Sequence, residues 1–165
     1  MTITVKSEVE MKEFGRKIGQ LLQGGEVIEL LGDVGAGKTT LTKGLASGLK
    51  VDDDVQSPSF TISRVYPARD GLVLAHYDFY RLNDAGIMAD ELRETINEPK
   101  TITVIEWGDV VAGVLPGDRL TIHIESPTEN SRTLKLIASG PRAQAVEARL
   151  WFYYLIPAHR FVSYR

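Results

Sequence analysis

The chain has no cysteine among its 165 residues. Disulfide bonds, catalysis by a thiolate and zinc sites built on cysteine are therefore excluded. No apolar run approaches the roughly 18 residues that a membrane-spanning helix requires, and no charged segment followed by an apolar stretch opens the chain. From these absences we expect a cytoplasmic protein that does not enter a membrane.

Clustered basic residues are absent as well. Nineteen Lys and Arg residues stand against 22 Asp and Glu residues, which gives a formal net charge of −3. A large face that binds DNA or RNA needs clustered Lys and Arg to neutralise the phosphates. We therefore expect no binding to DNA, and we expect another protein to hold any nucleic acid that is involved.

No internal repeat or linker divides the chain. Its content of 43% hydrophobic and 25% charged residues is typical of a globular domain with one core. Residues 150–165, however, hold six of the 13 aromatic residues. We predict a single domain over residues 1–149 and a tail over 150–165. For the tail three interpretations stay open: a packed terminal helix or strand, a partner-binding patch, and an altered chain end.

What the sequence does contain is a phosphate-binding motif. Residues 32–39 read Gly-Asp-Val-Gly-Ala-Gly-Lys-Thr, which matches G-x-x-x-x-G-K-[ST], and the apolar run 27–31 directly precedes them. Glycines let successive backbone N–H groups turn toward phosphate oxygens, Lys38 adds a positive charge, and Thr39 offers a hydroxyl to Mg²⁺. A helix that begins near Lys38 points its positive end at the same anion. The motif predicts a strand, a P-loop and a helix in that order.

The remaining elements follow from hydrophobic spacing and turn residues. Short apolar or alternating runs predict strands at 2–5, 61–66, 72–80, 101–107, 119–125 and 132–139, of which the second and third, and the last two, form hairpins. Capping residues and helical spacing predict helices from Ser7 to the Gly24-Gly25 pair, from the loop to about residue 49, from Asn83-Asp84 to about Ile96, and from Ala143 onward.

Two carboxylates are candidates for chemistry beside the loop. Glu106 lies at the end of the apolar strand 101–107, where a P-loop enzyme places an acidic residue that orients Mg²⁺ or water. Asp78 lies in a strand on which His76 and Tyr80 share its face. That face is unusually polar. Either it looks into the site, or 72–80 is an edge strand with a solvated polar face.

Four segments, taken in their order and spacing, carry a resemblance to a known family. They are residues 32–40, Ser57-Pro58-Ser59-Phe60-Thr61, His76-Tyr77-Asp78-Phe79-Tyr80-Arg81-Leu82 and Val104-Ile105-Glu106-Trp107. Together they closely resemble TsaE, formerly YjeE, the bacterial ATPase family required for threonylcarbamoyladenosine (t6A) modification of tRNA. The likeness covers about residues 2–140, and Ser59 departs from it because the family more often has Thr there.

The resemblance implies an α/β fold of the P-loop NTPase type, with a mixed, mostly parallel sheet flanked by helices, and ATP and Mg²⁺ as cofactors. It implies phosphate contacts by Gly35, Ala36, Gly37, Lys38, Thr39 and Thr40, and adenine contacts near Glu8 and Arg132. It implies Thr39 and Glu106 as metal ligands, and Lys38, Asp78 and Glu106 as catalytic residues. Segment 57–61 corresponds to the family's mobile, switch-like loop, and Trp107 could lie beside the nucleotide.

The resemblance further implies that the protein does not modify tRNA itself and meets it only indirectly. It joins TsaD and TsaB, which transfer the threonylcarbamoyl group, and its ATP hydrolysis resets that complex. Because no arginine finger is evident, we expect slow hydrolysis alone and faster hydrolysis with the partners. Two alternatives stay open. One is a P-loop kinase of a small metabolite, which usually has an arginine-bearing lid, and Arg81 and Arg93 alone are little evidence for such a lid. The other is a nucleotide-dependent binding module with incidental hydrolysis.

Overall fold

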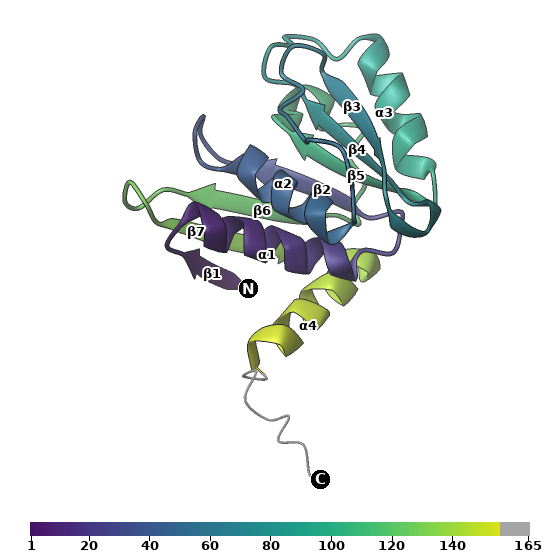
Figure 1. Cartoon of the computed structure of the whole chain (residues 1–165). Coiled ribbons are helices and arrows are strands. Elements are labelled where there is room, and N and C mark those ends of the chain that lie inside the picture. The colour runs from purple at the N-terminus through teal and green to yellow at the C-terminus, as the bar shows by residue number, and fades with distance from the viewer. Residues whose placement is uncertain (156–165) are drawn as a thin grey trace.

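A seven-stranded sheet forms the centre of the computed structural model, which describes residues 1–155 (Figure 1). Its strands are β1 (Thr2–Val5), β2 (Val27–Leu31), β3 (Ser63–Pro67), β4 (Val73–Asp78), β5 (Thr101–Glu106), β6 (Leu120–Glu125) and β7 (Arg132–Ala138). They lie in the order β1-β7-β6-β2-β5-β4-β3. The four inner strands from β6 to β4 are parallel, whereas β3 and β7 run antiparallel to their neighbours. The predicted P-loop α/β fold with a mixed, mostly parallel sheet is thereby confirmed.

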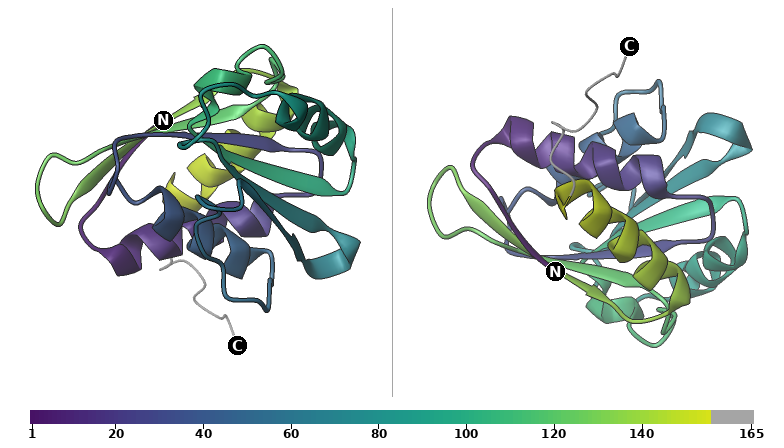
Figure 2. Two further views of the ribbon diagram at one scale, coloured as in Figure 1. Left: turned by 90° about the horizontal axis from the view of Figure 1, so that it is seen from above. Right: turned by 90° about the horizontal axis from the view of Figure 1, so that it is seen from below.

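Helices cover the two faces of this sheet unequally. Helices α1 (Glu8–Leu21), α2 (Lys38–Gly48) and α4 (Pro141–Leu155) pack on one face, where they share the larger core cluster with the inward residues of the strands (Figure 2). Helix α3 (Ile87–Asn97) and the 3₁₀ turn η2 (Gly108–Val111) pack on the other face with β4 and β5. The carboxyl ends of β4 and β5 therefore lie between two helical layers, and parallel sheets bind ligands at the carboxyl ends of their strands.

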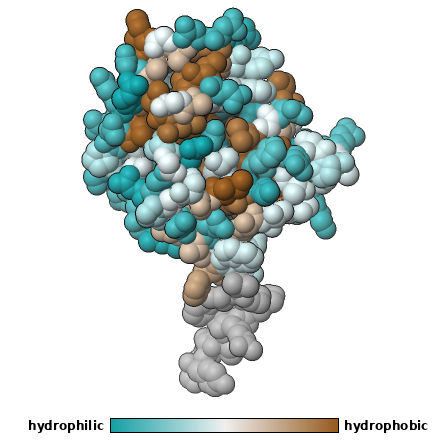
Figure 3. All heavy atoms as spheres, turned by 180° about the vertical axis from the view of Figure 1, so that it is seen from behind, coloured by the Kyte–Doolittle hydropathy of each residue, from teal (hydrophilic) through white to brown (hydrophobic). Residues whose placement is uncertain are grey.

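The second face of the sheet is left open beyond β2. Strands β6 and β7 alternate between buried and more exposed residues, as expected for strands with one covered face. Figure 3 shows the molecule from behind, where hydrophilic side chains separate several apolar patches. Within residues 1–155, no helix has both the length and the apolar character needed to span a membrane.

One prediction about local structure is wrong, and one of the open alternatives is excluded. Helix α3 begins at Ile87, after the cap residue Gly86, and not at Asn83-Asp84. The Asp84 carboxylate accepts a hydrogen bond from the Gly86 N–H at 3.0 Å, so it closes a turn and does not cap the helix. The edge-strand interpretation of 72–80 also fails, because β4 is paired with β3 on one side and with β5 on the other.

Helices α1 and α2 approach each other through glycine. Both carry glycines four residues apart, Gly15 and Gly19 in α1 and Gly44 and Gly48 in α2. A Cβ atom at any of the four would collide with main-chain atoms of the opposite helix. The two helices can therefore pack at this distance only while all four residues lack a side chain.

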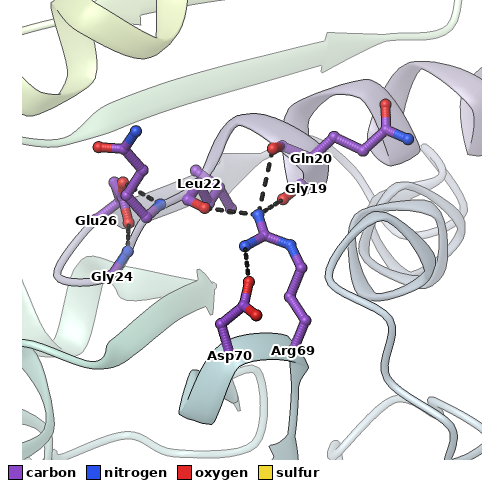
Figure 4. Close-up of polar contacts among 8 residues, drawn as sticks. Gly19, Gln20, Leu22, Gly24, Glu26, Arg69 and Asp70 are labelled. Atoms are coloured by element: carbon purple, nitrogen blue, oxygen red, sulfur yellow. Dashed lines mark hydrogen bonds and ion pairs between the residues drawn. The ribbon is translucent and has the colours of Figure 1, made fainter.

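The last turn of α1 has no basic residue of its own, and Arg69 from the 3₁₀ turn η1 (Arg69–Gly71) supplies one (Figure 4). One guanidinium nitrogen donates to the carbonyl oxygens of Gly19 and Gln20, each at 3.2 Å, and of Leu22 at 2.8 Å. Carbonyls in the last turn of a helix lack the usual intrahelical partners, although that of Gly19 also accepts from the Leu22 N–H at 3.4 Å. A cation there also complements the helix dipole. Arg69, which is 47 to 50 positions away along the chain, thus caps the C-terminal end of α1.

Helix α4 spans the position where the tail was predicted to begin. Its first N–H groups, those of Arg142 and Ala143, donate to the Asp118 carboxylate at 3.0 and 3.1 Å. Leu150 is buried in the larger core, and Tyr154 lies 6.3 Å from Phe14 of α1, measured between ring centroids. Trp151, Phe152, Tyr153 and Tyr154 are 43–69% exposed. The remaining tail residues, 156–165, lie outside the described part of the chain.

Candidate nucleotide site

The loop between β2 and α2 has the backbone conformation that its glycines permit. Gly32, Gly35 and Gly37 have φ values of 154°, 80° and 106°, in the region that residues with a side chain rarely adopt. A Cβ atom at Gly32 would also lie 2.8 Å from the main-chain oxygen of Ile124. Gly37 is the cap of α2, so the helix begins at Lys38 with its N–H groups directed into the loop. The motif residues therefore form a cradle for an anion.

Lys38 is folded back onto this cradle. Its side chain is buried, and its Nζ atom donates to the main-chain oxygens of Gly32 at 2.6 Å and Asp33 at 2.8 Å. Burial lowers the pKa of Lys38, while the charges of Glu106, Asp78 and Asp33 oppose that shift. Two of its three donors are used, so one N–H and the positive charge are left for an anion in the loop.

Asp78 and Glu106 lie side by side above the loop. They are register partners at the ends of the parallel strands β4 and β5, and Glu106 also pairs with Leu30 of the P-loop strand β2. Both are nearly inaccessible, at 5% and 3% exposure. Asp78 accepts hydrogen bonds from the Ser57 hydroxyl at 3.2 Å and from the Tyr80 N–H at 2.9 Å. Strand register thus brings together two carboxylates that are 28 positions apart in the sequence.

The side chains of His76, Asp78 and Tyr80, which were predicted to share one face, have different surroundings in the structure. His76 is fully buried and contacts Glu106, with 3.0 Å between Nε2 and Oε1. Tyr80 lies beyond the end of β4, is 54% exposed, and contacts Trp107 with 4.9 Å between ring centroids. Of the three, only Asp78 and Tyr80 line the cavity beside the loop. The contact between His76 and Glu106 was not predicted, because strand alternation gives a side chain's face but not its partner.

Trp107 follows Glu106 in a left-handed conformation, with φ 56°, which is rare for a bulky residue. The Nζ atom of Lys38 lies 4.6 Å from the centroid of its ring. A cation at this distance from an indole face is attracted by the ring's electron density. Such backbone strain is typical of functional sites, and here it brings an aromatic ring to the lysine of the P-loop.

Two of the cavities that flank the P-loop contain the predicted site residues, and each of those residues lines at least one of the two. The first has a volume of about 370 Å³ and is lined by Lys38, Thr39, Asp78, Glu106 and the segment residues Ser57 and Ser59, among others. The second, of about 440 Å³, is lined by Glu8, Ala36 and Arg132, among others. Both include Gly35, Gly37 and Thr40. We call them the carboxylate cavity and the outer cavity.

Arg132 has a role in the outer cavity that its sequence position did not reveal. Its Nε donates to the main-chain oxygen of Ala36 at 3.0 Å, and one terminal nitrogen donates to that of Gly35 at 3.5 Å. The other terminal nitrogen donates to the carbonyls of Thr128, Glu129 and Ser131 at 2.8–3.1 Å. The guanidinium thus ties the P-loop to the turn between β6 and β7.

Glu8 lies at the start of α1 and is largely exposed, with 69% of its side chain accessible. It pairs with Lys12, one turn further along the helix, at 3.1 Å. A surface pair of this kind contributes little to stability. Glu8 is therefore the least constrained of the predicted site residues.

The oxygen donors of the carboxylate cavity fit Mg²⁺ that arrives with a nucleotide. Mg²⁺ prefers hard oxygen ligands and is usually held by one or two carboxylates together with substrate phosphates. Thr39 and Glu106 offer a hydroxyl and a carboxylate in the cavity that Lys38 also lines. Within residues 1–155, no group of three or more His, Asp or Glu side chains could hold a metal ion by itself. The phosphates of a nucleotide would therefore have to complete the set.

Comparisons with known proteins agree with this geometry. The family model for threonylcarbamoyl adenosine biosynthesis protein TsaE matches residues 5–134. The chain is 41% identical over 116 residues to the tRNA threonylcarbamoyladenosine biosynthesis protein TsaE of Streptomyces coelicolor, which covers 70% of this chain and 78% of the relative. It is 35% identical over 134 residues to the TsaE of Treponema pallidum, covering 81% and 98% of the two chains.

A solved structure is similar over nearly the whole chain. The crystal structure of YdiB from Bacillus subtilis superposes with a TM-score of 0.77 and 31% sequence identity, covering 93% of this chain and 95% of that one. The match to the family model, over residues 5–134, includes the P-loop and both carboxylates. On these grounds the chain belongs to the TsaE family of threonylcarbamoyladenosine biosynthesis proteins.

Proposed function

We propose that this protein is a Mg²⁺-dependent ATPase of the t6A modification system, which acts in the cytoplasm on the TsaD–TsaB complex. The observation that carries the proposal is the carboxylate cavity, where Lys38, Asp78 and Glu106 converge beside a glycine cradle. The outer cavity adjoins it through Gly35, Gly37 and Thr40. A nucleoside triphosphate that lies along the loop would have its γ-phosphate in the carboxylate cavity and its base in the outer cavity.

Each residue has a separate task in this proposal. The N–H groups at the start of α2 and the charge of Lys38 bind the phosphates. Thr39 and Glu106 hold Mg²⁺, which when bound neutralises charge that develops on the phosphate oxygens. Asp78 orients the attacking water and accepts its proton. Because both carboxylates are buried, they can be fixed in place before the ligand arrives.

Segment 57–61 is where we expect partners to act. Ser57 donates to Asp78, so a movement of this segment changes a contact of the carboxylate that orients water. Arg81 lines the same cavity and lies over the ring of Phe60, with 4.1 Å between its guanidinium carbon and the ring centroid. Phe60 is 83% exposed and available to a partner. An ordering of this segment on the TsaD–TsaB complex would then accelerate hydrolysis.

The net negative charge also supports a protein partner over a direct contact with tRNA. If ATP strengthens docking and ADP weakens it, linkage requires that the partners tighten ATP binding by the same factor. Hydrolysis would then release the protein and reset the complex.

The test is ATP hydrolysis by the purified protein, alone and with TsaD and TsaB from the same source. We expect slow turnover alone, docking that requires ATP, and faster turnover in the complex. ATP-dependent docking with no change in turnover would support the binding module instead. Transfer of phosphate to a small metabolite, with no effect of the partners, would support the kinase.

A further inference from the structure

His76 is a buried titratable residue to which the proposed mechanism gives no task. It lies on β4, two residues before Asp78, and its side chain has no accessible surface. Its Nε2 atom lies 3.0 Å from Oε1 of Glu106, whose side chain is 4% exposed. No other hydrogen bond to the Glu106 side chain occurs within residues 1–155. His76 is therefore the neighbour that fixes this carboxylate.

The surroundings determine how the histidine bonds. An ionised carboxylate only accepts, so the ring's Nε2 carries the hydrogen and donates it. The Nδ1 atom is buried and has no partner among the described residues. Nε2 is therefore the ring atom that donates to Glu106.

The bond selects which oxygen of Glu106 serves a ligand. Oε1 is held by His76, while Glu106 also lines the carboxylate cavity. Oε2 is then the oxygen left for a metal ion or its water. A free Glu side chain samples several rotamers, and one fixed by a hydrogen bond presents this oxygen in a single direction.

We propose that His76 is a positioning residue, which orients Glu106 toward Mg²⁺ without touching the ligand. This inference rests on the proposed function. A histidine that only fills the core would affect stability, whereas a positioning histidine affects the response to Mg²⁺. Loss of such an outer partner typically lowers metal affinity or activity about 10- to 100-fold.

Three variants at this position separate the two roles. His76→Gln keeps an N–H near the place of Nε2, His76→Asn keeps polarity but falls short of Glu106, and His76→Leu removes the donor. Thr103→Val is the matched control, because Thr103 on the adjacent strand is also fully buried and its hydroxyl has no partner among residues 1–155. ATP affinity is measured by calorimetry, once in EDTA and once in a series of Mg²⁺ concentrations. Turnover is measured with TsaD and TsaB.

We expect His76→Leu and His76→Asn to bind ATP in EDTA within about twofold of the unmodified protein. The Mg²⁺ concentration at which half of the full change in ATP affinity is reached should rise at least about tenfold. Turnover with TsaD and TsaB should fall about 10- to 100-fold. His76→Gln should recover most of both, and Thr103→Val should behave as the unmodified protein does.

Two results would overturn the inference. One is a folded His76→Leu or His76→Asn with an unchanged Mg²⁺ response, which leaves only a core role. The other is a His76→Gln as impaired as His76→Asn. If His76→Leu does not fold, the Gln and Asn variants still decide. An unmodified protein that binds no ATP overturns the proposed function itself, before any variant is compared.

Discussion

The carboxylate cavity and the outer cavity are built in different ways. The carboxylate cavity is formed at the ends of β4 and β5, within the sheet, and its acidic residues are 3–5% exposed. The outer cavity is formed by the start of α1 and by the turn between β6 and β7, and Glu8 there is mostly exposed. Residues fixed by strand register keep their geometry without a ligand, whereas residues at the periphery can adjust to one. We infer that the chemistry is preorganised and that base recognition is not.

The strongest test of this contrast is to remove the buried carboxylates. In Glu106→Gln and Asp78→Asn, hydrolysis in the partner complex should fall about 10²- to 10⁴-fold, because a positioned acid or base is lost. ATP binding should persist, since the cradle and Lys38 are intact. Rapid-quench measurement of turnover, with calorimetry for binding, separates these effects. Asp52→Asn, in an exposed loop, is the control. Unchanged turnover in both variants would show that these carboxylates are only structural.

Removal of the positive charge that lines the carboxylate cavity should come next in size. Lys38→Ala should weaken ATP binding by about 2–5 kcal/mol, which is the cost of losing one partner of a buried charge pair. That corresponds to about 30- to 5,000-fold in affinity. Calorimetry on the folded variant measures it, with the exposed Lys43 of the same helix changed to Ala as the control. An unchanged affinity would remove Lys38 from the phosphate site.

Arg132 sharpens the comparison because it belongs to the outer cavity but holds the loop. If its contacts with Gly35 and Ala36 are its main role, Arg132→Lys should weaken ATP and inorganic tripolyphosphate by the same factor, about tenfold, because charged hydrogen bonds of about 1.5 kcal/mol are lost. If it contacts adenine, as the family resemblance predicts, ATP alone should weaken. Arg142→Lys is the control, since Arg142 donates to a carbonyl, that of Gly25, elsewhere in the fold.

The smallest effect is expected at Glu8. Its side chain is mostly exposed and is held only by a surface pair with Lys12, so any contact with the base is made in high dielectric. Glu8→Gln should therefore change ATP affinity by no more than about fivefold, which corresponds to about 1 kcal/mol. Competition between ATP and GTP is the measurement that could reveal more. A variant that loses the preference for adenine would show that Glu8 reads the base and that the outer cavity is more ordered than its exposure indicates.

The sequence predicted the parts of the site that depend on local pattern. The glycine spacing predicted the loop, and the apolar run before Glu106 predicted its place at a strand end. Alternation placed Asp78 on the correct strand but did not show whether that strand was internal. The pairing that decides this question depends on residues far along the chain.

What could not be predicted involves tertiary partners. Asp84 has the composition of a helix cap, but its carboxylate closes a turn to Gly86 instead. Arg132 contacts the P-loop, Arg69 contacts the end of α1, and His76 contacts Glu106. Each of these partners is 30 or more positions away along the chain, and only the turn at 128–131, which Arg132 also contacts, is near in sequence. No pattern along the chain indicates such contacts, because they depend on how the sheet brings distant strand ends and turns together.

The glycine contact between α1 and α2 has a consequence for how the protein tolerates mutation. The two helices begin at Glu8 and Lys38, one at the outer cavity and one at the P-loop, and Gly15, Gly19, Gly44 and Gly48 set the distance between them. A single added methyl group at any of the four would push the helix beginnings apart and change the span available to a nucleotide. In a saturation mutagenesis scan for growth, these four positions should rank with Lys38 and Glu106, although none of them touches a ligand.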